Sequence, residues 1–151
     1  MVVTFIGHAK FLNSDKFENK ILALLEKSVG DNSASFYLGG YGAFDEFAYE
    51  CCKKYKKAHK SVSLIFVTPY ITLSYQKNHL DSISTKYDGI IYPEIETKPL
   101  KYAIIYRNRW MIEKADLIIC GISHTYGNAY KAYKYAKQKG KLIFNVFGCD
   151  I

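Results

Sequence analysis

The stretch Leu38-Gly39-Gly40-Tyr41-Gly42-Ala43-Phe44-Asp45-Glu46 decides the fold. It follows an apolar run over 36–38 and precedes a helical pattern, so it predicts a glycine-rich turn that leads from a strand into a helix. Its glycines allow positive φ angles and leave backbone N–H groups uncovered by side chains. At a helix N-terminus such N–H groups, with the helix dipole, bind anions such as phosphate. The same glycines also fit a tight turn that holds no ligand, and the turn alone does not separate the two interpretations.

A second turn of this kind lies later in the chain. Gly121-Ile122-Ser123-His124-Thr125-Tyr126-Gly127 follows a predicted strand and precedes a predicted helix. A repeated strand-to-helix turn favours the anion-binding interpretation of both. Ser123, His124, Gly127 and Asn128 are therefore candidate ligand contacts.

Short β-rich runs alternate with longer helical patterns along the chain. The patterns predict strands over 2–6, 35–38, 62–67, 117–120 and 142–146, and helices over 15–29, 44–58, 101–114 and 128–138. Nearly continuous apolar strands between helices indicate a parallel sheet that is covered on both faces. We therefore expect a single α/β Rossmann-like domain over 1–151, with a mostly parallel open sheet of about five strands and helices on both faces. Residues 70–100 lack a clear period and predict an irregular insertion that covers the site.

The predicted strand ends bring the informative residues to one edge. Ligands of open parallel sheets bind beyond the carboxyl ends of the strands, where the strand order reverses. Gly7 and His8 follow the first strand, the glycine-rich turn follows the second, and the turn over 121–127 follows the fourth. This coincidence predicts a ligand site at that edge.

The charge of the chain sets its expected partners. The net charge is +7, and nearly all of the positive charge is lysine on helical segments, where lysines usually form a solvated face. Arg107 and Arg109 are the two arginines of the sequence. Because nucleic-acid surfaces are typically rich in arginine, we expect attraction to polyanions but no dedicated nucleic-acid site.

Other features narrow the class of protein. The cysteines, Cys51, Cys52, Cys120 and Cys149, show no CxxC spacing, and the histidines show no metal-ligand spacing. We therefore expect reduced thiols, no metal and no cofactor. The N-terminus shows no signal peptide and no apolar run is long enough to span a bilayer, so the expected location is cytoplasmic, away from membranes.

Several short motifs occur in order along the chain: Phe5-Ile6-Gly7-His8, the turn Gly39-Gly40-Tyr41-Gly42-Ala43-Phe44-Asp45, Lys101-Tyr102-Ala103, Arg107-Asn108-Arg109-Trp110-Met111, Ala115-Asp116 and Tyr126-Gly127-Asn128-Ala129. In this arrangement the chain resembles the SLOG superfamily of Rossmann-like domains, which includes the lonely-guy phosphoribohydrolases and the DprA-type DNA-processing proteins. It is most similar to the small bacterial and phage-associated members with a GGxGxFD turn. The resemblance implies a nucleotide-like ligand, with phosphate and ribose held by the two turns, and a homodimer.

The resemblance also bears on catalysis. Lonely-guy enzymes cleave the N-glycosidic bond of a nucleoside monophosphate with a glutamate in a PGGxGTxxE turn. Arg107 matches their arginine, but the stretch over 123–131 has neither the double glycine nor the glutamate. The chain therefore departs from the family pattern at the catalytic position.

Asp45 and Arg107 are the candidate catalytic residues. Cleavage of an N-glycosidic bond needs a carboxylate to stabilise an oxocarbenium-like state or to activate water. Asp45, beside the glycine-rich turn, fits that role, a ribose contact or a simple helix cap. Glu46 points about 100° away around the helix. Arg107 fits a bidentate phosphate clamp or a surface ion pair.

The sequence thus supports three hypotheses. The favoured one is a sensor or sequestering protein for a nucleoside monophosphate, ADP-ribose or NAD-like molecule, held by both turns. A second is a nucleotide N-glycosidase that uses Asp45 and Arg107. A third is a nucleic-acid-associated module like DprA. The candidate ligand contacts are Gly7, His8, Gly39, Gly40, Tyr41, Gly42, Asp45, Arg107, Ser123, His124, Gly127 and Asn128; Tyr70 and Tyr126 are further candidates for stacking on a base.

Overall fold

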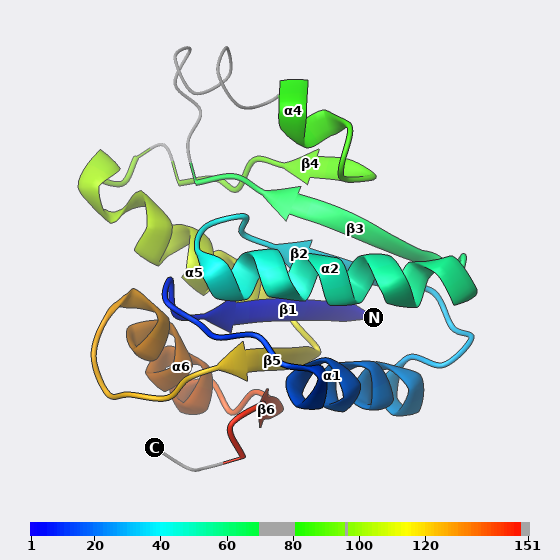
Figure 1. Cartoon of the computed structure of the whole chain (residues 1–151). Helices are drawn as coiled ribbons and strands as arrows, with labels where there is room; N and C mark the ends of the chain where they lie inside the picture. Colours follow the sequence, from blue (N-terminus) through cyan, green and yellow to red (C-terminus); the bar gives the residue numbers. More distant parts are fainter. Residues whose placement is uncertain (70–80, 96, 149–151) are drawn as a thin grey trace.

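The computed structural model describes residues 1–69, 81–95 and 97–148. Its strands are β1 Val2–Gly7, β2 Ala34–Leu38, β3 Val62–Val67, β4 Gly89–Ile91, β5 Leu117–Gly121 and β6 Ile143–Asn145. They form one six-stranded sheet in the order β4-β3-β2-β1-β5-β6 (Figure 1). Every neighbouring pair is parallel. The predicted α/β Rossmann-like class is therefore confirmed.

The helices cover both faces of this sheet. They are α1 Asp15–Ser28, α2 Ala43–Ala58, the short α4 Asp81–Ser84, α5 Ala103–Lys114 and α6 Asn128–Gln138, and a 3₁₀ turn, η2 Leu100–Tyr102, leads into α5. In Figure 1, α1 and α2 lie on the near face, and α5 and α6 lie on the far face. The helix predictions over 15–29, 44–58 and 128–138 agree with the structure within one residue.

The core is divided by the sheet into two clusters. On one face Ile21 and Leu25 of α1 pack with Phe44 and Tyr55 of α2 against β1, β2 and β3. On the other face the buried residues of α6, together with Ile112 of α5, pack against β1 and β5. Burial of large apolar side chains on both faces is the main stabilising contribution in such a layered fold.

Local signals explain where the first helix begins. The Ser14 side chain accepts a hydrogen bond from Phe17 N, and Asp15 and Glu18 place negative charge in the first turn. Both features stabilise a helix N-terminus, by capping and by interaction with the dipole. Ser14 is therefore the N-cap of α1.

β4 is the strand that the sequence pattern did not predict. It has three half-buried residues and lies at the edge of the sheet. Asp88 positions it, because its carboxylate accepts a hydrogen bond from Leu64 N and its backbone N–H donates to Leu64 O. A run this short carries no clear periodicity, so the prediction of about five strands missed it. The rest of the predicted insertion includes 70–80 and 96, which lie outside the described residues.

The strand order places the site. It reverses at β1, whose chain neighbour β2 lies on one side while β5 lies on the other, and Gly7 pairs with Gly121 at the end of β1 and β5. The chain therefore diverges at this point, as at the ligand-binding crevice of open α/β sheets. Within the described residues no helix is long and apolar enough to cross a membrane. Of the cysteines, Cys51, Cys52 and Cys120 are buried free thiols, and Cys149 lies outside the described part.

Candidate functional site

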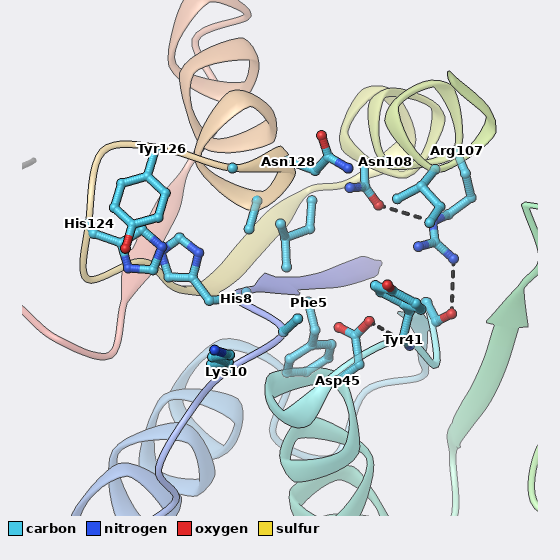
Figure 2. A pocket seen from close by; sticks show the side chains of 17 residues that line it. Phe5, His8, Lys10, Tyr41, Asp45, Arg107, Asn108, His124, Tyr126 and Asn128 are labelled. Atoms are coloured by element: carbon cyan, nitrogen blue, oxygen red, sulfur yellow. Dashed lines mark hydrogen bonds between the residues drawn. The ribbon is translucent and has the colours of Figure 1, made fainter. Parts of the chain in front are cut away.

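A cavity of about 430 Å³ opens at the carboxyl ends of β1 and β5. Figure 2 shows its side chains, which come from the loop after β1, the two glycine turns and the start of α5. Most of the predicted contacts line it: Gly7, His8, Gly39, Tyr41, Asp45, Arg107, His124, Gly127 and Asn128. The sequence therefore located this cavity, while the binding role of each residue stays a prediction.

Three predicted contacts lie elsewhere. Gly40 lines a separate cavity of about 540 Å³ on the other side of Asp45, together with Glu46. Gly42 packs against Ala9, and a Cβ on it would lie 2.6 Å from Ala9 Cα. Ser123 is exposed, and its Oγ lies 3.3 Å from Nδ1 of His124. These three residues therefore do not line the cavity at the ends of β1 and β5. Tyr70 lies outside the described residues.

The first glycine turn is closed by the protein itself. Gly42, the residue before α2, has φ 93° and ψ 174°, a conformation that favours glycine. Two N–H groups at the start of α2 donate to the loop after β1: Ala43 N to Ala9 O at 2.8 Å and Phe44 N to His8 O at 3.4 Å. These donors are thus used internally, which leaves less of this turn for an anion than the sequence suggested.

The second glycine turn has the same backbone but different surroundings. Gly127, the residue before α6, has φ 92° and ψ 172°, and no side chain caps the helix. A Cβ on Gly127 would meet nothing within 4 Å. Gly127, Asn128 and Ala129 all line the cavity, so the positive end of the α6 dipole faces it. The start of α6 is thus more open to the cavity than the start of α2.

Arg107 holds the first turn in place. It is buried, and its Nη1 donates hydrogen bonds to Gly39 O at 2.9 Å and to Val67 O at 3.0 Å, while Nε donates to Asn108 Oδ1 at 3.0 Å. Its guanidinium lies so close to Gly39 that a Cβ there would approach it to 2.9 Å. Arg107 therefore ties the ends of β2 and β3 to α5. The surface ion-pair interpretation is wrong for this buried side chain, and the phosphate-clamp role stays a prediction.

Arg109 faces away from the cavity, as its helical spacing from Arg107 predicts. It is exposed, and its guanidinium lies over the rings of Tyr106 and Tyr135. The two arginines therefore have separate environments.

Asp45 is a buried carboxyl in the wall of the cavity. It lies in the first turn of α2, and one carboxylate oxygen accepts a hydrogen bond from Tyr41 N at 2.9 Å (Figure 2). Burial raises the pKa of Asp45 from 3.8 to about 6, although the Arg107 charge and the Tyr41 hydrogen bond act in the opposite direction. Tyr41 precedes Gly42, the N-cap of α2, so this contact holds the glycine-rich turn and does not cap the helix. A carboxyl that titrates near neutrality is also suited to acid–base chemistry.

Three aromatic rings form one side of the cavity, beside the second turn (Figure 2). The His8 and His124 rings stack with centroids 3.4 Å apart and an interplanar angle of 11°, and His124 lies 3.9 Å from Tyr126. His8 is 5% exposed, whereas Tyr126 is 70% exposed. Burial lowers the pKa of His8, and the nearby His124 lowers it further, while a backbone hydrogen bond with His124 raises it.

Sequence reasoning missed several lining residues: Phe5, Ile6, Ala9, Lys10, Ile104, Asn108 and Ala129. Lys10 and Asn108 add polar groups, and the others are apolar. Asn108 was detectable, because the helix over 101–114 already placed it beside Arg107. Among the described residues no group of His, Cys, Asp and Glu is arranged to hold a metal ion.

Comparisons with known proteins add a structural relationship. No family model matches the chain, and no curated protein matches it either. Among solved structures, DNA processing protein A (DprA) from Helicobacter pylori aligns with a TM-score of 0.61 at 19% identity, over 96% of this chain and 64% of that chain. DprA from Streptococcus pneumoniae aligns with a TM-score of 0.62 at 16% identity, over 95% of this chain and 49% of that chain.

These alignments show the fold. The chain has a DprA-like Rossmann fold, and it spans about half to two thirds of the length of the DprA chains. The H. pylori protein is described by its single-stranded DNA binding mode. The comparisons identify no particular SLOG member.

Proposed function

We propose that this protein binds a phosphate-bearing nucleotide unit in the cavity at the switch point of the sheet. One observation carries the proposal: the uncapped N-terminus of α6 opens into a cavity at the carboxyl ends of β1 and β5. Backbone N–H groups and the helix dipole at such a position stabilise a phosphate. The cavity volume of about 430 Å³ falls in the range of ordinary small-molecule sites.

Side chains suited to bind the base and the ribose of a nucleotide also line the cavity. Tyr41 and Tyr126 line the cavity and are 60% and 70% exposed, so either ring is available to stack on a base. Asp45 and Asn108 offer hydrogen-bonding groups to ribose hydroxyls. The ligands that we favour are a nucleoside monophosphate, ADP-ribose or an NAD-like molecule, for which the protein acts as a sensor or sequestering protein.

A ligand panel tests this proposal. The purified protein is incubated with nucleoside monophosphates, ADP-ribose, NAD and cyclic nucleotides, and ultrafiltration with mass spectrometry follows retained and newly formed compounds. We expect one compound to be retained intact. Release of a free base or of nicotinamide, lost in Asp45→Asn, would instead establish an N-glycosidase. If no compound is retained at millimolar concentration, the cavity is not a nucleotide site.

Single-stranded DNA binding is a second candidate, and the structural neighbours favour it. The charge distribution supports it too, because residues 97–148 hold all of the excess positive charge: Lys98, Lys101, Arg107, Arg109, Lys114, Lys131, Lys134, Lys137, Lys139 and Lys141 against Glu113 and Asp116. On α6, Lys134 and Lys137 lie over the rings of Tyr130 and Tyr133. Basic groups interleaved with aromatic rings suit single-stranded nucleic acid.

A salt titration tests this second function. We expect a single-stranded oligonucleotide to bind with a steep salt dependence, and Lys131→Glu with Lys134→Glu on α6 to weaken it strongly. The matched control is Lys53→Glu with Lys57→Glu, which makes the same charge change at exposed positions of α2. Equal losses in both variants, or binding that disappears by about 150 mM salt, would indicate unspecific polyanion attraction.

A further inference from the structure

His8 is the most unusual polar group of the cavity. It lies directly after β1, is 5% exposed and lines the cavity. Its Nε2 atom is buried and has no hydrogen-bond partner among the described residues. Buried polar atoms in folded proteins nearly always have a partner, so this one indicates a group that arrives from outside the chain.

The side chain that packs on His8 comes from the second glycine turn, over 121–127. The stacked His124 ring lies 3.4 Å away, and Tyr126 continues the stack on its other side. Ser123, Thr125 and Gly127 of the same turn are exposed, and no side chain caps the helix that follows. His8 and the start of α6 line the same cavity, so a ligand phosphate at the N-terminus of α6 lies on the side of the cavity that His8 also lines.

The charged and titratable groups around His8 come from every element that lines the cavity. His124 and Tyr126 lie on the second turn, Lys10 lies on the same loop, Tyr41 and Asp45 lie at the start of α2, and Arg107 lies on α5. Asp45 is the carboxylate of this set. An anion that enters the cavity adds negative charge near His8 and so favours a proton on its ring.

We propose that His8 is the specificity-determining contact for a phosphate monoester: on binding, its imidazole takes up a proton from the buffer and Nε2–H donates a hydrogen bond to a phosphate oxygen. The proposal deepens the proposed nucleotide-binding function and rests on it. An imidazolium beside a doubly charged phosphate forms a charge-assisted hydrogen bond, which is stronger than a neutral one. The contact therefore favours terminal monophosphates over diesters, which carry a single charge.

The sign of the pH dependence follows from linkage. In the unliganded protein the pKa of His8 lies below 6.5, because burial and His124 disfavour the charged ring. A bound phosphate raises the pKa of His8, so between the two values binding takes up a proton. Affinity then increases as the pH falls from 8 toward about 6, where the monoester itself begins to be protonated.

Calorimetry measures this proton directly. Adenosine 5′-monophosphate is titrated into the full chain at pH 7.0 in two buffers of different ionisation enthalpy, and the difference in heat gives the protons taken up. We expect a substantial fraction of one proton for the wild type and none for His8→Phe, which keeps an aromatic ring in the stack. His8→Asn is the second variant, in case the larger Phe ring disturbs folding.

Two further variants separate the alternatives. His59→Phe is the matched control, because His59 also stacks on an aromatic ring, that of Tyr55, but lies outside the cavity; it should leave the proton uptake unchanged. Asp45→Asn tests whether the proton goes to Asp45 instead. Uptake that persists in the His8 variants, or that disappears only in Asp45→Asn, overturns the role of His8. If the wild type binds no nucleotide at all, the proposed function itself fails, which is a different result.

Discussion

The two glycine turns have almost the same backbone and opposite surroundings. Gly42 and Gly127 differ by only 1–2° in φ and ψ, and neither α2 nor α6 has a side-chain cap. Yet Ala9 and His8 accept hydrogen bonds from the start of α2, whereas the start of α6 opens into the cavity. A glycine pattern thus predicts the backbone conformation, but a distant loop decides whether the helix end is available to a ligand.

The largest expected difference between the turns is in stability. Gly42→Ala combines a strained φ with a Cβ 2.6 Å from the Ala9 backbone, so we expect it to lower the free energy of unfolding by about 4 kcal/mol. Gly127→Ala has the strain without the clash, so we expect a loss of about 1–2 kcal/mol. Urea denaturation of both variants measures the difference. Equal losses would mean that the loop after β1 does not close the first turn.

The second largest expected loss of stability comes from breaking the contact between Arg107 and the first turn. Arg107→Gln removes hydrogen bonds to Gly39 O and Val67 O from a buried site, so we expect a loss of about 3 kcal/mol. The exposed Arg109→Gln, two residues along α5, should change stability by less than about 0.5 kcal/mol. Thermal and urea unfolding of the pair check this. A tolerated Arg107→Gln would show that the carbonyls of the turn find other donors.

Asp45 makes stability depend on pH in a direction opposite to most carboxylates. Its pKa is higher in the folded chain, about 6, than its ordinary 3.8, so the folded state holds the proton more tightly. The contribution of Asp45 to the free energy of unfolding therefore rises as the pH falls from about 6 to about 4, by at most about 3 kcal/mol. The lowered pKa of His8 acts in the other direction, since its contribution is lost as the pH falls through 6.5 and below.

The difference in the free energy of unfolding between wild type and Asp45→Asn separates the pH dependence due to Asp45 from that due to His8. We expect the variant to be the more stable protein at pH 8 and to lose this advantage near pH 4. Urea unfolding at several pH values gives the two curves. Parallel curves over this range would mean that Asp45 has an ordinary pKa and is not desolvated.

The smallest expected effect concerns anion affinity at the two helix starts. Asn128→Asp places a negative charge at the first residue of α6, so we expect binding of a nucleoside monophosphate to weaken about fivefold. Ala43→Asp makes the matching change at the first residue of α2 and should alter affinity by less than about twofold. A larger loss of affinity in Ala43→Asp than in Asn128→Asp would mean that the phosphate binds at the first turn.

The sequence predicted the alternation of strands and helices well, because buried parallel strands and amphipathic helices have clear apolar patterns. It missed β4, whose three residues are too few to show a period and whose position depends on the Asp88–Leu64 hydrogen bonds. It also brought the glycine turns and His8 to one edge of the sheet, since chain order alone places strand ends there, whereas Arg107 was a candidate through the family resemblance.

The inner details of the site depend on contacts between distant segments. The carbonyls of His8 and Ala9 that close the first turn, the burial of Arg107 and the stack of His8 on His124 each join residues more than thirty positions apart. No local pattern encodes such pairings. The sequence therefore found the cavity but could not tell which of the two turns is open to a ligand.

The uneven placement of charge has a consequence for how an anion reaches the protein. The excess positive charge lies in residues 97–148, which include α6, and α6 starts at the cavity. An approaching anion is thus drawn toward one side of the molecule before it makes any contact. Ionic strength should therefore change mainly the rate of capture, while the lifetime of the bound state depends on the groups inside the cavity.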